Sequence, residues 1–187
     1  MSKAEAAPNL YADLVGPAWD ELSPAVYKAH LQGETMQAKA IFRIQRGRNP
    51  LARLLATLGR LPAESDAAPV KLSVRRVPEG EVWDRQFGNT RLVSTQVDAG
   101  DGLLGERFGL MKVHFRFSVS DGTLSYATHS ACLTPGGLHI PIPKALAPQI
   151  LAVESAASDG ISPHIFVSVS APPIGLLVSY EGDLDVE

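Results

Sequence analysis

The sequence predicts an α+β protein built on a strongly curved antiparallel β-sheet or open β-barrel of about nine to ten strands. N-terminal helices and one further helix are expected to pack on this sheet. From Pro69 onward, short segments of alternating apolar and polar residues are separated by turn sequences such as Gly88-Asn89 and Asp121-Gly122. Connections this short join antiparallel neighbours, because a parallel pair needs a long crossover. So many antiparallel strands are expected to curl or close, since an open sheet leaves its edges unpaired.

Two sites in the N-terminal third carry helix-start signals. Ser23 followed by Pro24 is typical of a helix start, because a serine side chain caps free backbone N–H groups and proline suits the first helical position. Asn49 and Pro50 repeat the signal before LARLLATLGRL, which predicts a helix at about residues 50–60. Four leucines of this helix recur on one stripe, which we expect to cover one side of the sheet. They are Leu51, Leu54, Leu55 and Leu58.

Strand-like alternation occupies most of the remaining chain. A first strand is expected over 35–45, where Met36, Ala38 and Phe42 share one face. The other candidates are 70–77, 80–87, 90–98, 102–108, 111–119, 123–133, 149–157, 162–170 and 175–182. The stretch PIPKALAP interrupts the series and is expected to be a loop with one helical turn.

Composition favours one ordinary globular domain. A chain of 187 residues, with 45% hydrophobic and 20% charged residues, is long enough for one sizeable core. We therefore expect a single domain over 1–187, with a helical segment at about 9–32 and a strand-rich body over 35–187. The net charge of -3 and the pI near 5.9 give no basic footprint for a nucleic-acid partner.

The same sequence predicts a cytoplasmic protein. The single cysteine, Cys132, excludes an intramolecular disulfide and fits a reducing compartment. The opening residues lack the apolar stretch of a signal peptide, and no apolar run approaches the roughly 20 residues of a membrane span.

No motif indicates a cofactor or a metal, and we expect neither. Gly100-x-Gly102-x-x-Gly105 matches the dinucleotide-binding fingerprint by letter, but strand pattern rather than a helix follows it, which favours a hairpin turn. The five histidines lack the spacing of a metal-binding helix. A Gly-x-Ser-x-Gly nucleophile motif is also missing from the sequence.

The segments EVWDRQFG and GERFG are the best candidates for a functional site. Side chains two apart in a strand share a face, so each segment places charges and large aromatic rings in one row. The first row holds Glu81, Trp83, Arg85 and Phe87, and the second holds Glu106 and Phe108. A row of this composition is typical neither of a solvated face nor of a plain core.

Charged residues inside otherwise apolar strands allow two interpretations. They are Arg85, Glu106, Arg107 and Glu154. A buried charge is costly without a partner, so these groups can be structural ion pairs within the sheet or at its rim. Alternatively, a carboxylate and a guanidinium orient a ligand in an apolar pocket, or glutamates there perform acid–base chemistry. Spacing alone does not show which face of the sheet is concave.

Several segments taken together resemble the bacterial domain-of-unknown-function family 4166. They are YADLVGPAWDELSPAVYKAH, RGRNPLARLLATLGRLP, PVKLSV, EVWDRQFG, LLGERFG, IPIPKALAP, AVESAASDG and PPIGLLVSYEGDL. The residues that fit the family's recurring pattern are Trp83, Arg85, Phe87, Gly88, Glu106, Arg107, Phe108, Gly109, Glu154, Gly175 and Tyr180. The resemblance implies a module that stands alone or follows saccharopine-dehydrogenase-like reductases, which makes an NAD(P)-dependent reductase a candidate partner. It implies no established activity.

Three functions remain open at this point. The first is a protein that binds an apolar or amphipathic small molecule in a cavity lined by Trp83, Arg85, Phe87, Glu106, Phe108, Phe115 and Phe166. The second is a cofactor-free cyclase, isomerase or hydratase in the same pocket. Its candidate catalytic residues are Glu106 and Glu154 as acid or base, and Arg85 and Arg107 to stabilise negative charge. The third is an interaction module for a reductase, which requires a large exposed apolar patch.

Overall fold

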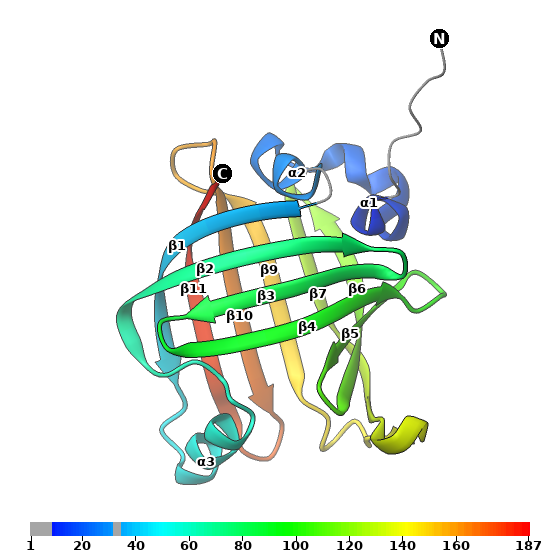
Figure 1. Ribbon diagram of the computed structural model, residues 1–187, viewed down its shortest axis with the longest axis vertical. Helices are drawn as coiled ribbons and strands as arrows, with labels where there is room; N and C mark the ends of the chain where they lie inside the picture. Colours follow the sequence, from blue (N-terminus) through cyan, green and yellow to red (C-terminus); the bar gives the residue numbers. More distant parts are fainter. Residues whose placement is uncertain (1–8, 32–34) are drawn as a thin grey trace.

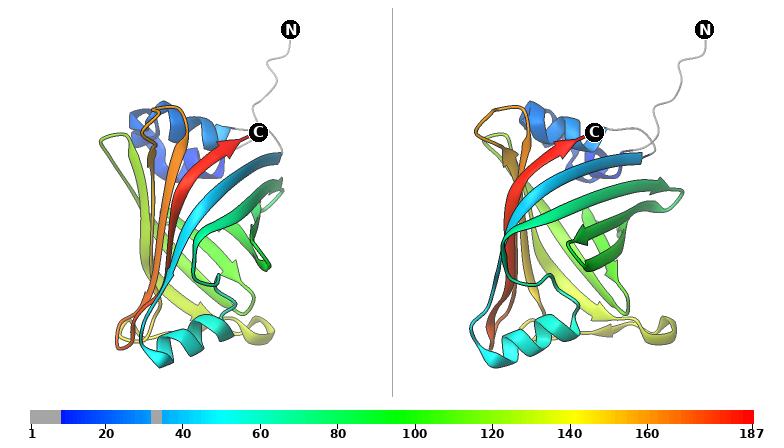
Figure 2. Two further views of the ribbon diagram at one scale, coloured as in Figure 1. Left: turned by 90° about the vertical axis from the view of Figure 1, so that its left-hand side faces the viewer. Right: turned by 60° about the vertical axis from the view of Figure 1, so that its left-hand side comes forward.

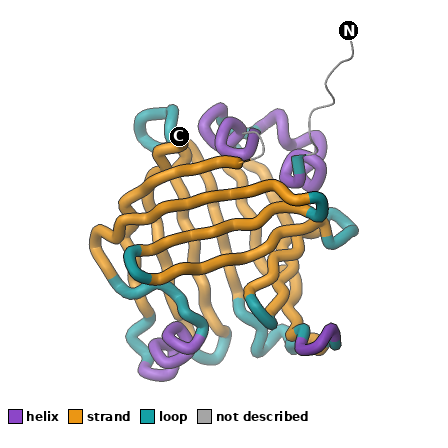
Figure 3. The backbone as a smooth tube through the Cα atoms, in the orientation of Figure 1, coloured by secondary structure: helices purple, strands orange, loops and turns teal. Residues whose placement is uncertain are grey.

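The computed structural model describes residues 9–31 and 35–187, and strands make up most of them (Figures 1 and 3). The helical elements are α1 (Leu10–Val15), the 3-10 helix η1 (Gly16–Glu21), α2 (Pro24–Leu31), α3 (Pro50–Leu58) and the 3-10 turn η2 (Pro135–Gly137). The strands are β1 (Thr35–Arg46), β2 (Ser65–Val77), β3 (Gly80–Phe87), β4 (Thr90–Asp98), β5 (Leu103–Phe108), β6 (Met111–Ser120), β7 (Thr123–Leu133), β8 (Ile140–Pro141), β9 (Gln149–Ala156), β10 (Pro163–Ala171) and β11 (Gly175–Val186).

The strands form a closed antiparallel barrel. Strands β1 to β7 pair in chain order, β7 continues to β9, β10 and β11, and β11 pairs back with β1. The two-residue strand β8 adds a short pairing at the end of β7. The predicted antiparallel barrel of nine to ten strands is therefore confirmed, and within the described residues its ten-strand ring is closed rather than open. Closure removes the free edges that an open sheet would expose.

Helices cover the two ends of the barrel (Figures 1 and 2). We call the end with α1 and α2 the upper end, and the end with α3 the lower end. Asn9 caps α1, and its Nδ2 also donates a hydrogen bond to the carbonyl oxygen of His30 in α2 at 2.9 Å. The Ser23 N–H donates to the carbonyl oxygen of Gly122, in the β6–β7 turn, at 2.9 Å. These two bonds hold the two ends of α2 at the upper end of the barrel.

The predicted helical segment at about 9–32 is present as three short helices over 10–31, and residue 32 lies outside the described residues. None of the described helices has both the length and the apolar character that a membrane crossing requires.

Helix α3 begins where the sequence predicts, with the Asn49 side chain accepting a hydrogen bond from the Leu51 N–H at 2.9 Å. The predicted burial of its leucine stripe is wrong. The residues that pack are Ala52 and Ala56, which form a small cluster with β10 and β11. Three of the leucines are exposed instead: Leu51 by 49%, Leu54 by 54% and Leu58 by 70%. The reason is that α3 crosses the end of the barrel, where a narrow alanine face allows close approach, rather than lying on its wall.

The other differences from the predicted elements are small. Strand β2 begins at Ser65, five residues before the predicted start at 70, and β11 continues to Val186. The turn expected in PIPKALAP is present, since the N–H groups of Leu146 and Ala147 both donate to the carbonyl oxygen of Pro143.

We expect Gly182→Ala to destabilise the barrel. A Cβ at this position of β11 would lie 2.3 Å from Phe42 Cδ1 and 2.6 Å from the carbonyl oxygen of Ile41. Overpacking of this kind costs about 1–3 kcal/mol of unfolding free energy, which urea denaturation can measure. Asp185→Ala, at an exposed position of the same strand, serves as the control. A Gly182→Ala variant that is as stable as the wild type would contradict the close contact between β1 and β11.

Candidate functional site

The barrel encloses a cavity of about 360 Å³, and all ten strands of the ring contribute side chains to its wall. A barrel of ten strands is wider than one of eight, whose interior side chains can nearly fill. The cavity extends from His30 at the upper end to Leu55 and Leu146 at the lower end. Leu146 lines the cavity and is also 63% exposed, so the cavity reaches solvent at the lower end.

A first polar cluster in the wall joins β3, β4 and β5. Arg85 Nη2 donates to Glu106 Oε1 at 3.1 Å, and Arg85 Nη1 donates to Ser94 Oγ at 2.8 Å. The Ser94 hydroxyl donates to the same Glu106 oxygen at 2.5 Å. Burial disfavours the charged guanidinium, but the Glu106 carboxylate raises the pKa of Arg85 above its usual value. Arg85 Cζ also lies 4.8 Å from the ring centroid of Trp83, within cation–π range.

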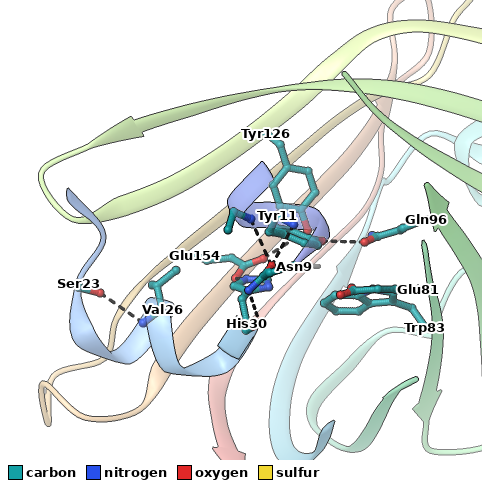
Figure 4. A network of polar contacts seen from close by, with 11 residues as sticks. Asn9, Tyr11, Ser23, Val26, His30, Glu81, Trp83, Gln96, Tyr126 and Glu154 are labelled. Carbon is teal, nitrogen blue, oxygen red and sulfur yellow. Dashed lines mark hydrogen bonds and ion pairs between the residues drawn. The ribbon is translucent and has the colours of Figure 1, made fainter. Parts of the chain in front are cut away.

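A second cluster lies beneath α1 and α2, where an aromatic ring covers an ion pair (Figure 4). His30 Nε2 lies 2.7 Å from Glu154 Oε2, and both side chains are almost fully buried. The Tyr126 hydroxyl donates to Glu154 Oε1 at 3.4 Å. The Tyr11 ring stacks on His30 with 4.1 Å between centroids, and its hydroxyl donates to Gln96 Oε1 at 2.8 Å. The helices therefore supply part of the cavity wall.

Burial and charge set the protonation of this cluster. Burial alone lowers the pKa of His30, but the facing Glu154 carboxylate, its hydrogen bond and the charge of Glu81 outweigh burial and the Arg76 guanidinium, so the pKa is raised. Burial raises the pKa of Tyr11 and of Tyr126 well above the usual range, so both phenols stay protonated. The raised pKa of His30 favours its charged form beside Glu154, which also accepts a hydrogen bond from the neutral Tyr126 hydroxyl.

A third acidic residue of the inner face, Glu81, is also matched by a base. Trp83 Nε1 donates to Glu81 Oε2 at 3.0 Å, and Arg76 Nε lies 3.8 Å from Glu81 Oε1. Among the described residues, each of the three buried carboxylates therefore has its own basic partner: Arg76 for Glu81, Arg85 for Glu106 and His30 for Glu154. The upper part of the interior is rich in charge but electrically balanced.

The structure brings most of the residues proposed from the sequence to the cavity wall. These are Trp83, Arg85, Phe87, Glu106, Phe108, Phe115 and Glu154. Two others face outward. Arg107 is exposed, and its Nε donates to the carbonyl oxygen of Gly109 at 3.0 Å. Phe166 lies between the wall residues Ile165 and Val167 on β10. Both corrections follow from strand alternation, because neighbours of an inward residue point outward.

Sequence reasoning missed three polar residues of the wall, Tyr126, Tyr180 and His30. Tyr126 shares a row with Leu124 on a predicted strand, and Tyr180 fits the recurring family pattern, so both had a signal. His30 had none, because periodicity does not place a helix over the end of a barrel. Among the residues described by the structure, no group of three or more His, Cys, Asp or Glu could hold a metal ion.

Comparison with known protein families matches residues 22–184 to a family described as "Domain of unknown function (DUF4166)". The match runs from the start of α2 to near the end of β11 and includes both polar clusters, except for Tyr11. It confirms the resemblance seen in the sequence. No curated protein matches the chain significantly.

We expect His30→Gln to change how stability depends on pH. Because the pKa of His30 is raised on folding, its contribution is complete below the unfolded pKa of about 6.5 and is lost as pH rises through the folded pKa. The unfolding free energy of the wild type should therefore fall relative to that of His30→Gln above about pH 6.5, as measured by urea denaturation across a pH series.

His129→Gln is the matched control, since His129 is exposed on β7. It should follow the wild type across the series. A difference between wild type and His30→Gln that stays constant with pH would contradict a charged His30–Glu154 pair.

Proposed function

The chain belongs to the domain-of-unknown-function family DUF4166, and we propose that it binds an apolar or amphipathic small molecule inside the barrel. The observation that supports this proposal is the cavity of about 360 Å³ with a largely apolar wall and polar groups gathered at one end. Pockets for small molecules combine these two properties, because apolar contact provides affinity and a few polar groups fix orientation.

The two parts of the wall favour different parts of a ligand. Near the lower end the lining comes from Leu55, Leu61, Ile150 and Val169, which suits a hydrocarbon portion. At the upper end the ligand would meet the Tyr126 hydroxyl and the carboxylates of Glu106 and Glu154. An elongated molecule with one polar end satisfies both regions.

Charge balance favours an uncharged polar end. Each buried carboxylate in the part of the chain that the structure describes already has a basic partner, so a charged headgroup would enter without a counterion or would have to separate an existing pair. Either event leaves a charge buried and unpaired, which is heavily penalised. A hydroxyl, carbonyl or amide can instead exchange hydrogen bonds with the same groups.

The proposal predicts selectivity among ligands that share one chain. We expect 1-decanol to bind more tightly than decanoic acid or decylamine, by at least about tenfold, because the last two carry a charge at neutral pH. Isothermal titration calorimetry on the three compounds measures the difference. Failure of all three to bind would contradict the proposal, and a preference for either charged compound would contradict the uncharged end.

Two tryptophan variants on β9 distinguish binding inside the barrel from binding on its surface. Ile150 lines the cavity and Leu151, its neighbour, is exposed on the outer wall. We expect Ile150→Trp to fill the lumen and abolish 1-decanol binding, while Leu151→Trp binds like the wild type. Equal binding by both variants would place the ligand elsewhere.

The His30–Glu154 pair favours a second candidate, a cofactor-free enzyme of the cyclase, isomerase or hydratase type. The two side chains lie 2.7 Å apart and both line the cavity. Glu154 would remove a proton from the ligand, the His30 imidazolium would return one at a neighbouring atom, and Arg85 would stabilise developing negative charge. The Trp83 ring lies between the two clusters, in contact with Arg85 and 6.5 Å from the His30 ring centroid.

We expect Glu154→Gln, which keeps the shape of the side chain but removes its basicity, to abolish such proton transfer. Exchange of the protons next to the carbonyl of 2-decanone, followed by NMR in deuterated buffer, provides the readout. Loss of a general base should slow exchange by about a hundredfold or more. Glu181→Gln removes a carboxylate that pairs with Arg43 on the outer wall and should keep the wild-type rate. Wild-type exchange no faster than in buffer would contradict the enzymatic candidate.

A further inference from the structure

Large apolar side chains stand exposed around the lower end of the barrel. The α3 leucines described above are joined by Leu138, which is 67% exposed, and by Leu146. Figures 1 and 2 show α3 and the segment 134–148 at this same end. Leu55 of α3 and Leu146 also line the cavity, so the exposed leucines lie on the two segments that close its lower end. We call Leu51, Leu54, Leu58, Leu138 and Leu146 the apolar rim.

Positive charge accompanies the apolar rim. Arg48, Arg53, Arg60 and Lys144 are exposed in the segments that carry it. Glu64 is the sole acidic residue of the segments 46–64, 134–148 and 171–175, and its carboxylate lies 3.6 Å from Arg53. The whole chain has a net charge of -3, so the lower end is cationic in an otherwise acidic protein.

We propose that the lower end docks on the surface of an anionic lipid bilayer. Leucines beside arginine and lysine are the composition of interfacial helices, in which apolar side chains enter the boundary between headgroups and acyl chains and cations lie among the headgroups. The short helix α3, held by its alanine face, presents its leucines outward in this manner. A purely apolar partner would cover the leucines but would leave the cations without counter-charges.

Docking in this orientation sets the cavity mouth against the hydrocarbon of the bilayer. An apolar ligand would then pass between membrane and lumen without crossing water. This passage rests on the proposed binding function, whereas docking does not.

Vesicle sedimentation of the full chain, with no added ligand, tests the proposal. We expect binding to vesicles of phosphatidylglycerol and phosphatidylcholine, weaker binding to phosphatidylcholine alone, and weakening with salt. Leu54→Glu/Leu58→Glu should reduce binding at least about tenfold, because it replaces apolar contacts by charges that anionic headgroups repel.

Leu151→Glu/Ile161→Glu is the matched control, since it introduces the same charge at exposed apolar positions outside the apolar rim, on the outer wall of β9 and in the β9–β10 turn. It should bind like the wild type. The Ile150→Trp variant should also bind vesicles, so failure of the ligand proposal is distinguishable from failure of docking.

Three outcomes would overturn the proposal. The first is a wild-type protein that ignores anionic vesicles, and the second is equal binding by the two double variants. The third is a dimer in analytical ultracentrifugation that Leu54→Glu/Leu58→Glu dissociates, because the rim would then be covered by a second copy.

Discussion

The pairing of β11 with β1 is the constraint on which the other features depend. It turns a meander of strands into a ring, so each strand must present one face to a common lumen. The alternation of side chains then decides which residues meet there. The same closure brings β11 so close to β1 that only glycine fits at position 182. With ten strands the ring is wider than its inward side chains can fill, and the cavity follows from that width.

Buried charge is the second determinant of the interior. Each carboxylate in the lumen is stabilised by a partner from another element: Glu106 on β5 by Arg85 on β3, and Glu154 on β9 by His30 on α2. Such pairs fix relative positions strongly, since removing one partner leaves the other buried and unpaired. The His30–Glu154 contact therefore docks α2 on the barrel as well as shaping the site. The sequence allowed these charged residues to be either structural ion pairs or ligand contacts. In the barrel the same residues can serve both roles.

The local alternation of apolar and polar residues made the strands predictable. It did not predict where the helices and their side chains lie in the closed barrel. The ranges 80–87, 90–98 and 123–133 agree with β3, β4 and β7 because turn chemistry and period-two patterns act over a few residues. The inward row of Trp83 and Arg85 follows from the same rule. Arg107 and Phe166 each alternate with the inward residues of their strand, so both face outward despite a residue type that suits a binding site. The α3 leucines and His30 depend on how helices sit on a closed barrel, which no local pattern encodes.

The two ends of the cavity differ in a way that bears on ligand choice. In the described part of the chain, α1 and α2 cover the upper end with buried side chains such as Tyr11 and Val26, whereas the lower end reaches solvent beside Leu146. The barrel would therefore restrict the size of an elongated ligand at the ligand's polar end and leave the length of its chain unrestricted. Extra length can project through the mouth, but extra bulk at the polar end meets packed aromatic rings. Such a barrel would accept a homologous series of chain lengths while discriminating sharply among headgroups.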